Sequence, residues 1–202
     1  MAQPRTVEPV VRFCALISGQ QNASEIAIQH LQRVWGAIVD RSEPVPFDEG
    51  GFYRAAMGGG LTKTLLVFED FSDPADLADW KIQTNRMEQD IAALSSDASR
   101  QNASDVSGQH AHTHCPTRPV NIDPGYISQA KLVLATIKDR DHRVYLRDGI
   151  FGEVTLNYTG GDWISHRWSY PSYQQQEVIA LVKRCRLRLR QHLRQTGGFR
   201  TA

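Results

Sequence analysis

Short apolar runs alternate with helical stripes of apolar residues along most of the chain. Runs such as VRFCALISG and LTKTLLVFEDF predict buried strands, whereas apolar residues three and four positions apart predict amphipathic helices. Ser24 and Asp73 are predicted as helix N-caps, and Gly36 as the end of the first helix. Strands are predicted at 11–19, 61–71, 118–123 and 131–138, and helices at 24–36, 73–94 and 174–194. A weak strand is predicted at 37–47, where Pro44 and Pro46 favour a sheet edge or a loop.

The clearest local pattern is a hairpin over 142–158, HRVYLRDGIFGEVTLNY. Asp148-Gly149 lies between two alternating runs, which is typical of a two-residue type I′ turn. Counting outward from this turn puts His142, Glu153 and Thr155 on one face and Arg143 on the other. We expect both faces to be covered at least in part. The predicted facing pairs are Arg147 with Ile150, Leu146 with Phe151, Val144 with Glu153, and His142 with Thr155.

The stretch RPVNIDPGYI places two polar residues within an apolar alternation. Strand geometry puts Val120 and Ile122 on one face, toward the helices, and Asn121 and Asp123 on the other. Asp123 could instead cap a Pro-Gly turn at 124–125, with the glycine supplying a positive φ. That alternative accounts for Asp123 but poorly for Asn121, so both residues are candidates for a site.

Ionisable side chains also gather around the start of the hairpin. A carboxylate on an apolar face needs a partner, and His142 could serve Glu153 as an oriented general base or simply as a structural contact. Lys138 and Arg143, within the run KDRDHR, could hold a phosphate or carboxylate, or could form a solvated turn. Because these cations disfavour a bound cation, no metal is predicted in this site. The residues identify no cofactor.

The second helix and the segment after it carry further polar residues. Lys81 and Glu88 flank the core stripe, with Asn85 just beyond, and such residues could line a pocket, although partly exposed Lys–Glu neighbours are the favoured expectation. The segment at about 96–117 has almost no large apolar residue, which predicts a disordered loop insertion. Its histidines and cysteine could bind metal adventitiously, but their spacing is unlike a structural zinc site. They are His110, His112, His114 and Cys115.

Two further patterns bear on function. GGGLTKT resembles a phosphate loop, but Thr62 replaces the glycine before Lys63 and the stretch leads into a strand. The last helix has an apolar stripe and a basic solvent face, so contact with nucleic acid is possible but not favoured. The stripe is Val178, Leu181, Val182, Cys185, Leu189 and Leu193; the basic residues are Lys183, Arg184, Arg186, Arg188, Arg190 and Arg194.

Composition sets the broad class. The 202 residues carry a formal net charge of +1, which gives no general case for nucleic acid or membrane surfaces. The first residues do not read as a signal peptide, and no apolar run is long enough to span a bilayer. Three widely spaced cysteines are typical of reduced thiols, so a cytoplasmic location is expected. The oligomeric state is not predicted.

Several longer motifs carry a family resemblance. RPVNIDPGYI, KLVLATIKDRDHRVYLRDGIFGEVTL and WSYPSY match most closely, and PFDEGGFYRAAMG and KIQTNRME more weakly. Together they resemble the domain-of-unknown-function 4416 family of prokaryotic proteins, with 98–117 as an insertion. The resemblance implies no substrate, because the family brings no assigned activity. The sequence differs from the family pattern at Ala56, where an acidic residue is usual, and at Ser172 and Gln174, where YPDYR has Asp and Arg.

These patterns predict one domain, residues 1–202, of the α+β class. The element order fits a ferredoxin-like βαββαβ core extended by a C-terminal β-hairpin and a terminal basic helix. The predicted function is an enzyme or binding protein for a small anionic molecule, and the sequence does not decide whether it is an enzyme. The alternative is an interaction module that docks its basic helix on nucleic acid or protein. Predicted catalytic residues are His142, Glu153 and Asp123, and predicted ligand-binding residues are Asn121, Lys138 and Arg143.

Overall fold

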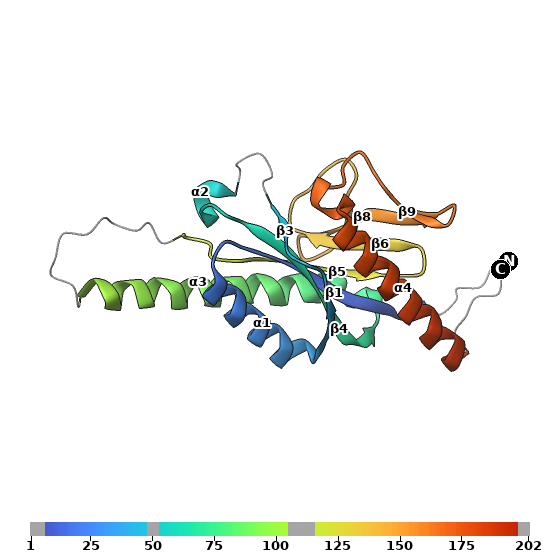
Figure 1. Ribbon diagram of the computed structural model, residues 1–202, viewed down its shortest axis with the longest axis horizontal. Helices are drawn as coiled ribbons and strands as arrows, with labels where there is room; N and C mark the ends of the chain where they lie inside the picture. The colour runs from blue at the N-terminus through green and yellow to red at the C-terminus, as the bar shows by residue number, and fades with distance from the viewer. Residues whose placement is uncertain (1–6, 48–52, 105–115, 198–202) are drawn as a thin grey trace.

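The computed structural model describes residues 7–47, 53–104 and 116–197, with side chains from 97 to 104 left out. These residues form an α+β fold with a nine-stranded antiparallel sheet (Figure 1). Its strands are β1 (Val10–Ser18), β2 (Ile38–Arg41), β3 (Val45–Pro46), β4 (Thr62–Ser72), β5 (Asn121–Ile127), β6 (Lys131–Thr136), β7 (Val144–Arg147), β8 (Ile150–Thr159) and β9 (Asp162–Ser165). Its helices are α1 (Gln21–Trp35), α2 (Arg54–Met57), α3 (Leu77–Ser104) and α4 (Gln176–Thr196), with short 3₁₀ turns η1 (Pro74–Asp76) and η2 (Pro171–Gln174).

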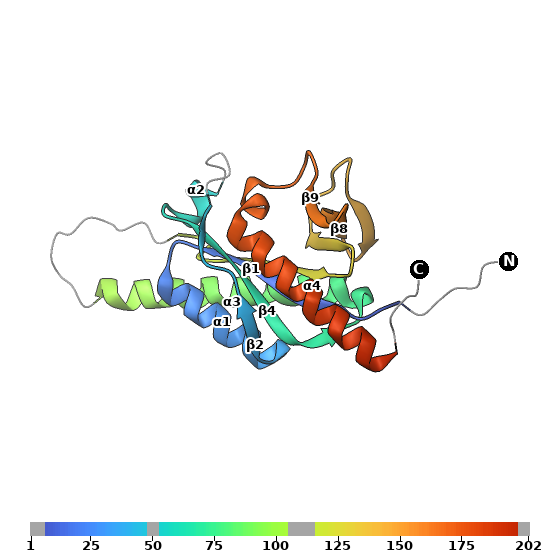
Figure 2. The ribbon, with the colours of Figure 1, turned by 45° about the vertical axis from the view of Figure 1, so that its right-hand side comes forward.

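The sheet lies between two helical layers (Figures 1 and 2). Its strand order is β2-β4-β1-β5-β6-β8-β7, with β3 beside β4 and β9 beside β8. One core cluster packs α1 and α3 against residues such as Leu16 and Ile122, and the second packs α4 against residues such as Phe13 and Leu65. Since neighbouring strand residues point to opposite faces, both faces bury an apolar set. No helix in the described part of the chain has the length and apolar character to cross a membrane.

Most predicted elements are present, and three local signals are confirmed. Asp148 and Gly149 both have positive φ, 53° and 75°, as a type I′ turn requires. The Asp73 side chain accepts a hydrogen bond from the Ala75 backbone N–H at 2.8 Å, ahead of Pro74. All six predicted apolar positions of α4 are buried.

The second long helix was predicted too short. The α3 helix runs to Ser104, ten residues beyond the predicted end at Leu94, and in Figure 1 it continues past the edge of the sheet. Its polar C-terminal half contains no Gly or Pro, and the Ser95 and Ser96 hydroxyls donate to carbonyls four residues earlier. A scarcity of apolar residues deprives a segment of contacts with the core, but it does not prevent the segment from forming a helix. The rest of the predicted loop, 105–115, lies outside the described residues.

The first helix starts earlier than predicted. The α1 helix begins at Gln21, so Ser24 lies within its first turn and its hydroxyl donates to the Gln20 carbonyl at 3.0 Å. Gly36 ends the helix with a φ of 88°, as expected. The apparent N-cap was therefore wrong, because a serine can also return its hydroxyl to the backbone inside a helix.

The Pro-Gly turn predicted after Asp123 is absent. Strand β5 runs through Pro124 and Gly125, which lie opposite Cys14 and Phe13 of β1. A Cβ at Gly125 would lie 2.4 Å from the Val133 carbonyl oxygen and 2.7 Å from the Phe13 ring. The glycine is thus required by close packing between strands rather than by a turn.

Candidate functional site

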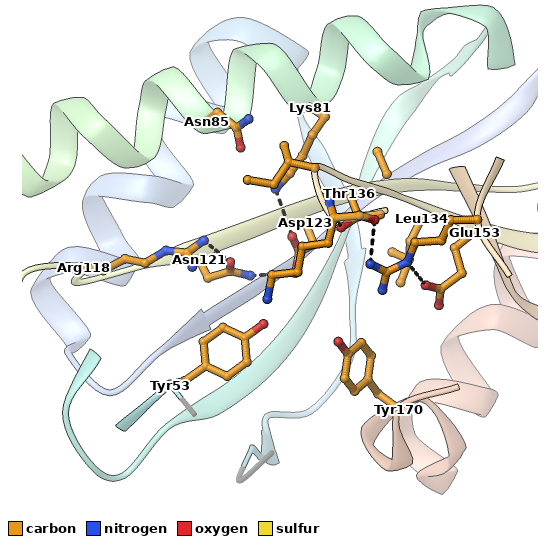
Figure 3. A pocket seen from close by; sticks show the side chains of 14 residues that line it. Tyr53, Lys81, Asn85, Arg118, Asn121, Asp123, Leu134, Thr136, Glu153 and Tyr170 are labelled. Atoms are coloured by element: carbon orange, nitrogen blue, oxygen red, sulfur yellow. Dashed lines mark hydrogen bonds and ion pairs between the residues drawn. The ribbon is translucent and has the colours of Figure 1, made fainter. Parts of the chain in front are cut away.

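The candidate site lies where β5 and β6 separate. The ladder between them covers Gly125–Ile127 and Leu132–Leu134, so Asn121 and Asp123 precede the paired segment. Pro124, which has no N–H to donate, stands immediately before the first paired residue. A cavity of about 90 Å³ opens at this point, large enough for a few waters or one small anion (Figure 3). Its polar lining is Tyr53, Lys81, Asn85, Arg118, Asn121, Asp123, Thr136, Lys138, Arg143, Glu153 and Tyr170, with Leu134, Ala135 and Ile137.

Asp123 is a carboxylate that opens into this cavity. Its Oδ1 accepts from Lys81 Nζ at 3.0 Å and its Oδ2 accepts from Asn121 Nδ2 at 2.6 Å, yet the side chain keeps 30% of its surface exposed. Burial alone would favour the neutral acid, but the charge and hydrogen bond of Lys81, the Asn121 amide and the charge of Lys63 lower the Asp123 pKa. Asp123 is therefore ionised at neutral pH.

A partly buried network of side chains from α3 and from Arg118 supports Asp123. Lys81 Nζ also donates to the Ile122 carbonyl at 3.0 Å, and Glu88 Oε1 accepts from the Ile122 N–H at 2.7 Å. Glu88 Oε2 accepts from Arg118 at 2.7 Å, and Arg118 also donates to Asn121 Oδ1. Burial raises the Glu88 pKa, against the opposing charges of Lys81 and Arg118.

The favoured expectation that Lys81 and Glu88 are partly exposed neighbours was wrong, whereas the alternative that these polar residues line a pocket is confirmed for Lys81 and Asn85. The Lys81 and Glu88 side chains are only 4% and 11% exposed, and their amine and carboxylate are 3.9 Å apart within the network. The apolar stripe of a helix predicts which of its residues pack against the core. It does not predict which polar residues beside the stripe become buried where two strands separate.

Glu153 on β8 forms the second group of contacts. Its Oε2 accepts from Arg143 Nε at 2.8 Å and lies 3.2 Å from His142 Nε2, while Thr155 Oγ1 donates to Oε1 at 3.3 Å. His142 also places Nδ1 2.9 Å from Asp141 Oδ1 and stacks on Trp168 at 5.0 Å. The predicted contact between His142 and Glu153 is present, with the carboxylate almost fully buried.

The hairpin register nevertheless differs from the prediction. Arg147 faces Ile150 as expected, but a β-bulge then places Tyr145 opposite Phe151 and Val144 opposite Gly152. Arg143, predicted on the face away from Glu153, therefore reaches it. The expectation that both faces of the hairpin are covered at least in part holds for β8, where the neighbouring residues Thr155 and Leu156 are both buried, but not for β7, where every residue is exposed.

Arg143 and Lys138 form the cationic side of the cavity. Arg143 Nη1 donates to the Lys138 carbonyl at 2.8 Å, and the charge of Arg143 acts on the Tyr170 hydroxyl, whose pKa it lowers against the larger effect of burial. Lys138 is an exposed residue whose Nζ lies 5.8 Å from the Tyr53 ring centroid. Desolvation and the charges of Arg118 and Arg143 lower the Lys138 pKa. Accumulated positive charge of this kind favours a bound anion.

Five of the six predicted site residues line this one cavity: Asn121, Asp123, Lys138, Arg143 and Glu153. His142 lies behind Glu153 and is not part of the lining. Sequence reasoning missed Tyr53, Arg118 and Tyr170, although each lies in a motif that carried the family resemblance. Figure 3 shows the hydroxyls of Tyr53 and Tyr170 directed toward the cavity from two sides. Burial raises the Tyr170 pKa, so its hydroxyl stays protonated and can donate.

The other candidate regions are placed as follows. GGGLTKT leads into strand β4 and not into a helix, so it is not a phosphate loop.

Among the residues that the structure describes, no group of three His, Cys, Asp or Glu side chains could hold a metal. The His-rich segment, His110 to Cys115, falls outside those residues, and the absence of a metal at the cavity stays a prediction.

The basic residues of α4 contact the protein itself. Arg184 donates to both oxygens of Asp40 at 2.7 and 2.9 Å, and Lys183 pairs with Asp162 at 3.0 Å. Arg186 donates to the Gln129 carbonyl at 2.7 Å and lies 3.6 Å from the Tyr158 ring centroid. Arg188 and Arg190 donate to the Phe68 carbonyl and to Gln129 Oε1, respectively.

Fold and site together define an α+β protein with a polar, net cationic cavity between two separated strands. The family model described as "Domain of unknown function (DUF4416)" matches residues 8–188, and the chain belongs to that family. No curated protein and no solved structure matches the chain significantly.

Proposed function

We propose that the cavity between β5 and β6 binds a small anionic molecule bearing a phosphate or carboxylate group. The observation that carries the proposal is the charge of the lining, where four cations face two carboxylates around one small space. The cations are Lys81, Arg118, Lys138 and Arg143, and the carboxylates are Asp123 and Glu153. Such a space favours an anion over a neutral or cationic ligand.

The anion would lie at the end of the cavity formed by Arg143 and Lys138. Lys81 already donates hydrogen bonds to Asp123 and to the Ile122 carbonyl, and Arg118 already donates to Glu88 and Asn121. Arg143 is held through Nε by Glu153 and through Nη1 by the Lys138 carbonyl, which fixes the plane of its guanidinium. A guanidinium fixed in this way suits charge-assisted hydrogen bonds to phosphate or carboxylate oxygens.

If the site also performs chemistry, Asp123 is the best placed of the three predicted catalytic residues. It is ionised and open to the cavity, so it can accept a proton from a bound molecule. Glu153 has both oxygens engaged, and His142 lies behind it. We therefore assign Glu153 and His142 to positioning Arg143.

Titration calorimetry at low salt with phosphate, sulfate and citrate tests the proposal. Lys138→Ala should weaken phosphate binding about tenfold, the usual loss for a charge-assisted contact. Lys183→Ala is the matched control, since it removes an equal charge from α4, where Lys183 pairs with Asp162. Wild-type protein that binds none of these anions would refute the proposal. An equal loss of phosphate affinity in both variants would show that phosphate responds to the overall charge of the protein and not to this cavity.

The alternative, docking of the basic helix on nucleic acid or an acidic protein, has less support. Five of its six basic side chains make the contacts with Asp40, Asp162, Gln129, Tyr158 and Phe68 described above. Binding through free cations would fall steeply with salt. Filter binding of RNA and DNA at low salt tests the nucleic-acid alternative, and a protein that retains neither would exclude it.

Two further points remain proposals of ours. A ferredoxin-like core is supported by the path β1-α1-β2-β4-α3-β5, by the spatial order β2-β4-β1-β5 and by the antiparallel ladders between them. A cytoplasmic location is supported by Cys14 and Cys185, which are free, buried thiols.

A further inference from the structure

The exposed carboxylate of Asp123 is the feature that a simple anion site does not require. An ionised carboxylate repels a phosphate or carboxylate placed against it. Asp123 nevertheless opens into the cavity with 30% of its side-chain surface exposed, while Asn121 beside it is buried. A bound anion must therefore stay at the end formed by Arg143 and Lys138, which leaves Asp123 facing another part of the ligand.

The hydrogen-bonding capacity of Asp123 indicates what that part is. Each carboxylate oxygen can accept two hydrogen bonds, and among the residues that the structure describes each has one donor, Lys81 Nζ for Oδ1 and Asn121 Nδ2 for Oδ2. The remaining capacity calls for a donor from the ligand. An ammonium group fits poorly, because Lys81 lies 3.0 Å away and the charge of Lys63 also acts on Asp123. A neutral hydroxyl meets the same need without repulsion.

We propose that the ligand is a small hydroxylated anion, a hydroxyalkyl phosphate or a hydroxy acid, whose hydroxyl donates to Asp123 while its anionic group lies against Arg143 and Lys138. This assignment rests on the proposed function and specifies its ligand class. Tyr170 and Arg143 both line the cavity, and Tyr53 and Tyr170 direct their hydroxyls toward it from two sides (Figure 3). The small cavity limits the ligand to a few atoms between the two groups.

The test uses pairs of probes that differ by one hydroxyl: ethyl phosphate with 2-hydroxyethyl phosphate, and propionate with lactate. Calorimetry on the full chain should show the hydroxylated member binding about tenfold tighter in at least one pair, as expected for a hydrogen bond to a charged acceptor. Which pair shows the gain separates a phosphate from a carboxylate ligand. Equal affinity within both pairs overturns this inference and leaves anion binding intact. No binding of any probe overturns both.

Asp123→Asn provides the second measurement. It removes the charge but keeps the shape, so the hydroxyl preference should fall below about threefold while ethyl phosphate binds more tightly. The double variant Lys81→Met with Asp123→Asn removes both charges of the ion pair and guards against misfolding of the single variant. Lys183→Ala should leave the preference unchanged. A tenfold preference that persists in a folded Asp123 variant would overturn the assignment.

Discussion

Lys81 on α3 and Asp123 on β5 form an ion pair at 3.0 Å across 42 positions of sequence. The alternation of β5 directs Ile122 toward the α1 and α3 side of the sheet and Asp123 toward the other. Lys81 reaches Asp123 because β5 and β6 are not paired at this level, and Figure 3 shows its side chain descending from the helix. The pair thus joins one helical layer to the cavity.

Replacing Lys81 with methionine should destabilise the protein by about 2–4 kcal/mol at pH 7, since removing one partner of a buried pair leaves the other uncompensated. Adding Asp123→Asn should recover part of this loss, because no buried charge then remains unpaired. Urea unfolding of the two single variants and the double variant measures the coupling. Strictly additive losses would show that the pair contributes no net interaction.

The same pair predicts a pH dependence. The folded-state Asp123 pKa is lowered, so its stabilisation is present above the unfolded value of about 3.9 and is lost as pH falls through the lower folded value. The gap between wild type and Lys81→Met should therefore be largest near neutral pH and should narrow below about pH 3.5. A gap that widens on acidification would contradict the assigned sign.

His142 is expected to act on ligand binding only through Glu153. His142→Ala should lower anion affinity by a few-fold, less than Lys138→Ala, and should reduce stability by about 1 kcal/mol through the lost contact. His142→Gln, which keeps an amide donor, should recover part of the affinity, whereas His142→Phe, which keeps only the stack on Trp168, should not. Abolished binding in a stable His142→Ala protein would mean that the imidazole touches the ligand.

Gly125 should tolerate no side chain. Gly125→Ala brings a Cβ to 2.4 Å from the Val133 carbonyl oxygen and to 2.7 Å from Phe13, which predicts a loss of about 2–3 kcal/mol. Gly59→Ala is the matched control, because its Cβ meets nothing within 4 Å and its φ is not positive. Thermal melting of both variants should show a lower Tm for the first alone.

The Asp40–Arg184 contact ties α4 to β2 at the surface. The hydrogen bonds and charge of Arg184 outweigh partial burial and lower the Asp40 pKa. Because the pair is exposed, Asp40→Asn should cost only about 0.5 kcal/mol at pH 7. This stabilisation exists above the unfolded pKa and is lost as pH falls through the folded value, so wild type and variant should converge near pH 3. High salt should also reduce the difference.

Local chemistry in the sequence determined the elements and several of their boundaries. The Asp148-Gly149 turn depends on two residues that accept positive φ, and the apolar stripe of α4 depends on helical periodicity, so both can be read without knowing any partner. The same holds for Asp73 before Pro74. The gathering of polar and ionisable residues in two motifs also indicated five of the fourteen residues that line the cavity.

Only the tertiary structure decided the features that depend on distant neighbours. Pro124-Gly125 has the local signature of a turn, but pairing with β1 and the close approach of Phe13 keep it extended. The bulge in β7 moved Arg143 onto Glu153, because one extra residue reverses which face a side chain takes. The buried Lys81 and the partly exposed Arg118 became partners of Glu88 only through the opening between β5 and β6. Sequence periodicity predicts which face of a helix or strand is apolar. Which charged side chains come into contact depends on how the helices and strands pack together.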